Sequence, residues 1–305
     1  MTEITFVDRT TKKISQEKVY GAFFLDLLYG DGAFAKFFSN FFRSMTAKWK
    51  WPSHFYGWLQ KTRISRLKIA PFIKKFGVDE TEFLDPIESF KCFNDFFIRR
   101  LKPSARPITQ GHDVAILPAD GRVLVFQNID KCDGFFIKGV KFSLPEFLLD
   151  EALSSQYAKG SMAIIRLAPC DYHRFHFPFN CLPQPPLSIE GTLYSVNPMA
   201  LKKDISILTK NKRERTALNS KFFGLVQYVE IGATHVGTIH QTFIPNEPYA
   251  KGDEKGCFSF GGSCIVLLFE PGRIQFDQDL LESSQKNIET RCLMGQTLGR
   301  ALNLF

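Results

Sequence analysis

The first hundred residues carry apolar side chains at helical spacing. Apolar residues in the segment 34–49 follow an i, i+3, i+4, i+7 pattern, which predicts an amphipathic helix. The sequence Asp-Pro-Ile-Glu at residues 85–88 supplies an N-cap, a first-turn proline and a reciprocal acidic residue. A second helix is therefore predicted to run from Asp85 to about Arg99.

After Pro107 the pattern changes to short apolar runs separated by Gly, Asn and Asp, which is typical of strands joined by turns. Ser143 and Glu146 form a capping box that predicts one helix inside this region, and residues 279–302 are also predicted to be helical. The predicted strands are residues 114–117, 122–127, 135–142, 162–167, 191–196, 222–232 and 265–269.

This order of elements predicts an α+β fold with a β-rich antiparallel sandwich or barrel core. N-terminal amphipathic helices and a C-terminal helix would complete it. We divide the chain into a helical region, 1–107, and a β-rich catalytic domain, 108–305.

The positive charge of the chain is concentrated near the N-terminus. The formal net charge is +8, yet residues 32–78 alone contain ten Lys or Arg and no Asp or Glu. With Phe the most abundant aromatic residue, this segment favours docking on an anionic membrane, and nucleic acid is the alternative partner. No uncharged apolar run reaches eighteen residues, so we expect contact with a membrane without crossing it.

Seven scattered cysteines argue against a disulfide scaffold. A zinc site from Cys170, His173 and His176 is an alternative, but its spacing matches no common finger and no fourth ligand is evident. No metal is therefore predicted.

Three short segments carry reactive side chains. Residues 168–178 hold two of the six histidines, His173 and His176, although an exposed polar turn is the simpler interpretation. Gly262 and Ser263 form a turn that leads into an apolar run, where the hydroxyl could attack the preceding carbonyl; a plain hairpin turn is the alternative. Asp120 lies in a Pro-Ala-Asp-Gly turn and would, alone, be a turn residue.

Together these segments resemble the phosphatidylserine decarboxylases. That family carries a Pro-x-Asp-Gly turn, an Asp-Tyr-His-Arg-x-His-x-Pro segment and a Gly-Ser-Thr motif in this order, matched here by residues 118–121, 171–178 and 262–264. Cys264 departs from the usual Thr or Ser and leaves the attacking serine intact. The likeness extends over about residues 90–298, and its flanking matches are residues 93–101, 194–198, 214–216, 232–237 and 251–256.

The resemblance implies a role for each reactive residue. Asp120 would orient His176, His176 would take the hydroxyl proton of Ser263, and Ser263 would attack the Gly262 carbonyl. The resulting ester would break down into a β chain, 1–262, and an α chain, 263–305, that begins with a pyruvoyl group. This cofactor would form a Schiff base with phosphatidylserine and yield phosphatidylethanolamine. His173, with an ordinary pKa near 6.5, would be the general acid.

Other interpretations stay open. A membrane-associated serine hydrolase would use Asp120, His176 and Ser263 without self-cleavage. A nucleic-acid-binding module lacks a recognised motif, so no nucleic acid is expected. We expect a peripheral protein on the cytoplasmic side of a bacterial cell membrane, with a mitochondrial inner membrane as the weaker alternative. A homo-oligomer is an open alternative, and Arg215 and Lys251 are candidate phosphate partners on charge alone.

Overall fold

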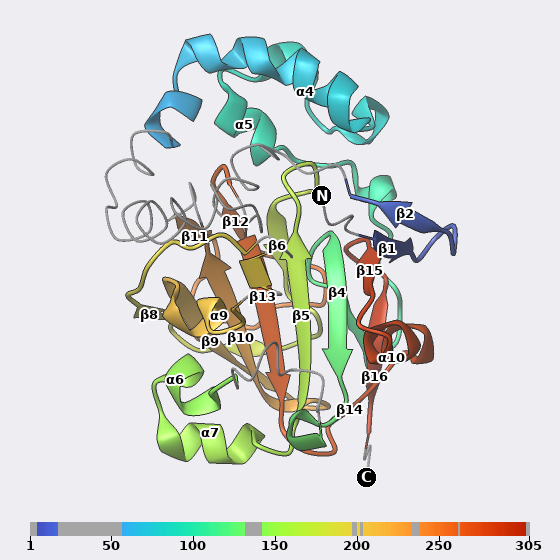
Figure 1. Ribbon diagram of the computed structural model, residues 1–305, viewed down its shortest axis with the longest axis vertical. Helices are drawn as coiled ribbons and strands as arrows, with labels where there is room; N and C mark the ends of the chain where they lie inside the picture. The colour runs from blue at the N-terminus through green and yellow to red at the C-terminus, as the bar shows by residue number, and fades with distance from the viewer. Residues whose placement is uncertain are drawn as a thin grey trace, which may run out of the picture.

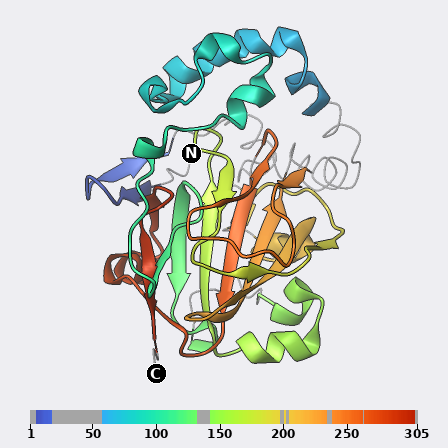
Figure 2. The same ribbon diagram turned by 180° about the vertical axis from the view of Figure 1, so that it is seen from behind.

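The computed structural model describes residues 5–17, 57–131, 142–196, 200–201, 204–233, 238–261 and 263–302. Figure 1 shows a β-rich body with a layer of helices beyond one end of its strands. The same layer lies beyond the same end in the reverse view of Figure 2. The predicted helix at 34–49 lies outside the described residues, and so does nearly all of the predicted strand at 135–142.

In the described part of the chain the largest sheet has ten strands. Its neighbouring strands pair antiparallel, except that residues 6–8 pair parallel with residues 289–291. The strand order is β2 (Ile14–Gln16), β1 (Thr5–Asp8), β15 (Glu289–Cys292), β4 (Gly121–Phe126), β5 (Ser161–Leu167), β13 (Ser263–Phe269), β10 (Gly224–Gly232), β9 (Arg213–Ser220) and β7 (Leu182–Pro183), with β8 (Leu187–Ile189) also paired to β9.

Two three-stranded sheets accompany it. One has the order β11 (Ile239–Gln241), β12 (Glu254–Phe258) and β6 (Arg174–His176). The other has the order β14 (Ile274–Phe276), β16 (Thr297–Ala301) and β3 (Val114–Ile116). Phe175 and Phe258 of the first small sheet share a buried apolar cluster with Ile265 and Leu267 of β13, so the sheets pack face to face. The predicted α+β class with a sandwich-like antiparallel core is confirmed.

Short helices cover the other face of the large sheet. They are α6 (Leu144–Leu148), α7 (Glu151–Tyr157) and α9 (Ile207–Lys210). Phe147 and Leu208 pack there against Val229 and Val266. The predicted N-cap at Ser143 is confirmed, because its side chain accepts a hydrogen bond from the Glu146 N–H at 3.3 Å.

The helical layer is held together by phenylalanines. Its elements are η1 (Arg63–Lys68), α4 (Ile69–Phe76), η2 (Glu80–Glu82), η3 (Ile87–Ser89), α5 (Phe93–Phe97) and η4 (Pro103–Ala105). Phe72, Phe93 and Phe96 pack with Phe260, which belongs to the β-rich part of the chain. No helix in the described segments is long and apolar enough to span a bilayer.

Three local predictions were wrong. The single helix from Asp85 to Arg99 is instead η3 and α5, separated by an extended stretch, and Asp85 pairs with Arg100 at 3.0 Å rather than capping a helix. Residues 191–196 form only an isolated bridge at Thr192. The C-terminal helix is confirmed only for α10 (Gln278–Gln285).

Two further differences concern the ends of the chain. Residues 289–301 form the strands β15 and β16 in place of the predicted helix. Gly295 lies between the two strands with a left-handed φ of 87°, which a regular helix does not allow. The hairpin of β1 and β2 was not predicted, although it extends the large sheet. One more short helix of the described residues, η5 (Ile129–Lys131), follows β4 in the middle of the chain.

Candidate active site

The strand registers bring the three reactive segments to one end of the large sheet. Asp120 directly precedes β4, Ser263 begins β13, and the histidine segment follows the end of β5. Ser263 pairs with Leu167 of β5, and Arg122 pairs with Arg166 of the same strand. Helices α4 and α5 lie beyond this end of the sheet in Figure 1.

Ser263 is completely buried, and its hydroxyl has no hydrogen-bond partner among the described residues. Alternation along β13 places its side chain on the face of Ile265 and Leu267, toward the small sheet that contains β6. A buried polar atom without a partner costs about 1–3 kcal/mol, so its retention points to a chemical role.

The loop before Ser263 is held from the helical layer. The Phe260 N–H donates to the Asn94 side-chain oxygen of α5 at 3.0 Å. Gly261 has a φ of 139°, a conformation that side chains rarely adopt. Gly262, the predicted site of cleavage, lies outside the described residues.

His176 is held at both ring nitrogens. Because a carbonyl only accepts, the 2.9 Å contact with the Gly252 oxygen places a proton on Nδ1 of His176. In the neutral ring Nε2 is then the acceptor, and the Tyr172 hydroxyl donates to it at 3.2 Å. Burial lowers the pKa of His176, and the carboxylates of Glu254 and Asp120 only partly oppose this shift.

His173 is more deeply buried. Its Nδ1–H donates to the Asp171 carbonyl at 3.0 Å, its ring centroid lies 3.8 Å from that of Phe97, and its Nε2 has no partner among the described residues. Burial lowers the pKa of His173 to about 3. The expectation of an ordinary pKa near 6.5 was therefore wrong, because desolvation disfavours the imidazolium.

Asp120 is buried and paired with arginine. Arg106 donates to its two oxygens at 2.8 and 2.6 Å, and the Met294 N–H donates at 2.8 Å. The backbone N–H of His176 donates to the Pro118 carbonyl at 2.8 Å, so the Asp120 turn and β6 are neighbours. Since both ring nitrogens of His176 bind other groups, the orienting role of Asp120 stays a prediction.

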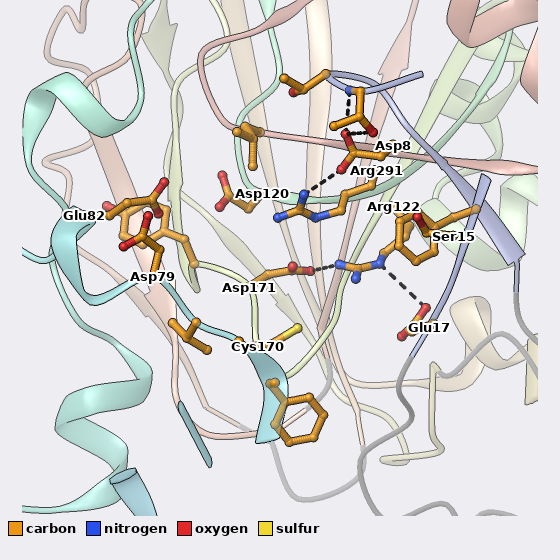
Figure 3. Close-up of a pocket in the computed structure, with 18 of the residues that line it drawn as sticks. Asp8, Ser15, Glu17, Asp79, Glu82, Asp120, Arg122, Cys170, Asp171 and Arg291 are labelled. Atoms are coloured by element: carbon orange, nitrogen blue, oxygen red, sulfur yellow. Dashed lines mark hydrogen bonds and ion pairs between the residues drawn. The ribbon is translucent and has the colours of Figure 1, made fainter. Parts of the chain in front are cut away.

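A cavity of about 610 Å³ lies beside these residues, lined by charged groups that include Asp120. Figure 3 shows Asp171 pointing toward Arg122, which also contacts Glu17 of the N-terminal segment. Tyr172 lines the same cavity. Sequence reasoning singled out the two histidines of residues 171–178 and not Tyr172, which contacts one of them.

The candidate metal ligands, the candidate phosphate partners and Cys264 remain to be placed in the structure. Within the described residues no group of three or more His, Cys, Asp and Glu side chains is placed to hold a metal ion. Lys251 donates to the backbone carbonyl of Gly111 at 2.6 Å, and one Arg215 nitrogen has no partner in the described part of the chain. Burial raises the pKa of the Cys264 thiol to about 12, so this neighbour of Ser263 stays protonated.

The chain is similar to known proteins of one family. The family model for phosphatidylserine decarboxylase matches residues 93–300. The chain is 47% identical to the phosphatidylserine decarboxylase proenzyme of Chlamydia pneumoniae over 296 residues, 97% of each chain. It is 46% identical to the proenzyme of Chlamydia trachomatis serovar D, over 98% of this chain and 97% of that one. The chain therefore belongs to the phosphatidylserine decarboxylase family.

Proposed function

We propose that the chain decarboxylates phosphatidylserine to phosphatidylethanolamine, using a pyruvoyl group made by self-cleavage between Gly262 and Ser263. Family membership makes the chain a decarboxylase, and its relatives carry the name proenzyme. The proposal rests on one observation above all: the buried Ser263 hydroxyl, without a partner in the described residues, at the start of the strand that follows two glycines.

The site fits a cofactor made from the chain itself. A pyruvoyl carbonyl at residue 263 would supply an electron sink for decarboxylation of an amine substrate. Before cleavage, His176 is a neutral base with its lone pair on Nε2, as proton removal from a hydroxyl requires. Displacing the Tyr172 hydroxyl from this nitrogen would allow Ser263 to take its place.

His173 stays the predicted group that passes a proton to the substrate. With a pKa of about 3 it carries no proton on Nε2 at neutral pH, so it must receive one in every turnover. The source of the proton that His173 receives must therefore be identified separately from the step in which His173 gives it to the substrate.

The two product chains would remain one molecule. Strand β13 of the α chain pairs with β5 and β10 of the β chain, and β15 pairs with β1 and β4. Separating the chains would remove a central strand of the large sheet, together with its buried apolar face.

The substrate is a lipid, and the helical layer offers a surface for an anionic membrane. Trp58, Ile64 and Leu67 have exposed fractions of 60, 78 and 78%. Lys61, Arg63, Arg66 and Lys68 are exposed among them. Apolar anchors surrounded by cations are the composition that binds an anionic leaflet peripherally. We propose this docking at the cytoplasmic side of a bacterial cell membrane.

A serine hydrolase would share the triad and keep Ser263 as a side chain. Intact mass separates the two functions: the proposal expects two chains divided after Gly262 and an α chain with a blocked N-terminus. Release of carbon dioxide from phosphatidylserine vesicles should accompany the divided form and be absent from the Ser263→Ala protein. An undivided wild-type chain that hydrolyses esters would establish the hydrolase.

A further inference from the structure

The decarboxylation proposed above consumes one proton per turnover. The bond from the α carbon to the carboxylate breaks, carbon dioxide leaves, and a new carbon–hydrogen bond forms at that carbon. His173 cannot store this proton, because its Nδ1–H is bound to the Asp171 carbonyl and its Nε2 is unprotonated at neutral pH. The enclosed site therefore needs a path for a proton from solvent.

Tyr172 stands between a cavity and a catalytic histidine. Tyr172 is one of the residues that line the 610 Å³ cavity, and it is only 5% exposed. Its hydroxyl contacts Nε2 of His176 at 3.2 Å, and the two rings stack with centroids 5.7 Å apart. The Gly252 carbonyl holds the opposite nitrogen, so Nε2 is the nitrogen that can take up a proton.

The cavity is suited to hold water. Besides Tyr172, its lining includes the carboxylates of Asp120 and Glu82 and the guanidinium of Arg106, groups that bind water where the space permits. The charged groups around the Tyr172–His176 pair are Arg174 and Glu254 on the strands β6 and β12, and Asp120 and Arg106 on the cavity side. Arg174 and Glu254 neutralise one another at 2.8 Å, as do Arg106 and Asp120 at 2.6 Å.

We propose that Tyr172 is a positioning residue that relays protons from the cavity to His176 during decarboxylation. A proton that enters from solvent through cavity water joins the Tyr172 oxygen as the hydroxyl proton passes to Nε2 of His176, so that no tyrosinate or hydroxide is left behind. The histidinium then supplies the proton that His173 passes to the substrate carbon, and both rings return to the neutral form. The proposal rests on the proposed function and adds a residue to its proton supply.

Self-cleavage makes no such demand. The proton that leaves the Ser263 hydroxyl can pass through His176 to the departing backbone amine, so no net proton enters from solvent. The two reactions of the same site should therefore respond differently to the loss of the Tyr172 hydroxyl. A proton relay predicts slower decarboxylation with unchanged self-cleavage, whereas a general structural role of Tyr172 predicts that both reactions are impaired.

The test compares Tyr172→Phe with Tyr157→Phe in the full-length protein. Tyr157 is a matched control, because it is fully buried and its hydroxyl donates to the Leu225 carbonyl at 2.7 Å. We expect Tyr172→Phe to divide into two chains like the wild type, while kcat on phosphatidylserine vesicles falls on the order of tenfold or more. The KM should change less, the solvent deuterium isotope effect on kcat should rise, and Tyr157→Phe should show none of this.

A divided Tyr172→Phe protein with wild-type kcat, pH profile and isotope effect would overturn the relay while leaving the proposed function intact. Failure of wild-type protein to divide or release carbon dioxide would instead overturn the function itself. Should Tyr172→Phe fail to fold, a fluorinated tyrosine at position 172 keeps the shape and lowers the hydroxyl pKa. The relay then requires a shifted pH profile of kcat, and an unchanged profile contradicts it.

Discussion

His173 and His176 differ in what their rings can do, although they lie three positions apart. Both rings have a proton on Nδ1 fixed by a backbone carbonyl, yet Nε2 of His176 is bound by Tyr172 and Nε2 of His173 has no partner in the described residues. The spacing of the two histidines in the sequence singles them out as candidates, but it does not show which groups surround each ring. The pKa of each is set by burial, which depends on Phe97 and other residues distant in sequence.

Buried neutral histidine makes stability depend on pH. The pKa of His173 is about 3 in the folded state and near 6.5 in the unfolded chain, so the unfolded chain binds more protons as the pH falls below 6.5. The stability contributed by neutral His173 is present above pH 6.5 and is lost as the pH falls toward 3. The loss is about 1.4 kcal/mol per pH unit for one such group.

We predict that His173→Asn in the uncleavable Ser263→Ala protein weakens this acid dependence. Denaturant unfolding between pH 7 and 5 measures it, and the matched control is His112→Asn, which changes an exposed histidine. An identical slope with and without His173 would show that the residue titrates normally in the folded protein.

At the scale of elements, the loop ahead of Ser263 depends on α5. The Asn94 side chain accepts from Phe260, and Phe260 packs on Phe93 and Phe97 of the same helix. The helical layer thereby positions the segment at which we propose self-cleavage.

Asn94→Ala should slow self-cleavage several-fold, because it leaves the Phe260 N–H without a partner at a cost of about 1–3 kcal/mol. Asn128→Ala is the control: its side chain accepts from the Asp130 N–H at 3.0 Å, and it follows the end of β4 opposite to Asp120. The fraction of divided chain against time, followed on a denaturing gel, gives the rates. Equal cleavage rates for the two variants would show that α5 does not position the loop for self-cleavage.

Strand prediction succeeded for the longest apolar runs and missed a strand whose sequence is mostly polar. Strands β5 and β13 are fully buried and follow directly from their apolar runs. Strand β9 was missed because its sequence is polar. Arg213 is nevertheless buried, and donates to the carbonyls of Phe147 and Thr209 at 2.8 and 2.6 Å. Those acceptors come from other elements, so local pattern could not reveal them.

For the molecule as a whole, the large sheet combines strands from both predicted chains. The sequence motifs located the residues Asp120, His173, His176 and Ser263, and the strand registers explain why three distant segments meet. The contacts of Tyr172 and Arg106 could not be predicted, since each depends on a tertiary neighbour.

We expect the divided protein to migrate as one species in size-exclusion chromatography and to separate into two chains only in denaturant. The reason is the central place of β13 in the sheet. Elution of an isolated α chain under native conditions would contradict this topology.

Replacing Ile64 and Leu67 by serine should reduce flotation with anionic vesicles, since each buried apolar side chain contributes about 2 kcal/mol. Neutralising Lys61, Arg63, Arg66 and Lys68 should act in the same direction and remove most of the salt dependence. Leu182→Ser with Leu187→Ser is the control, as these leucines are exposed on β7 and β8. If the serine variant and the neutralised variant float as well as the wild type, the membrane-docking surface must lie on another part of the protein.

The most direct test of the central claim is the intact mass of freshly purified, active protein. Self-cleavage predicts two masses, for residues 1–262 and for residues 263–305 with a pyruvoyl group in place of Ser263, and a single undivided mass for Ser263→Ala. Active protein that gives only the mass of the uninterrupted chain would contradict the account.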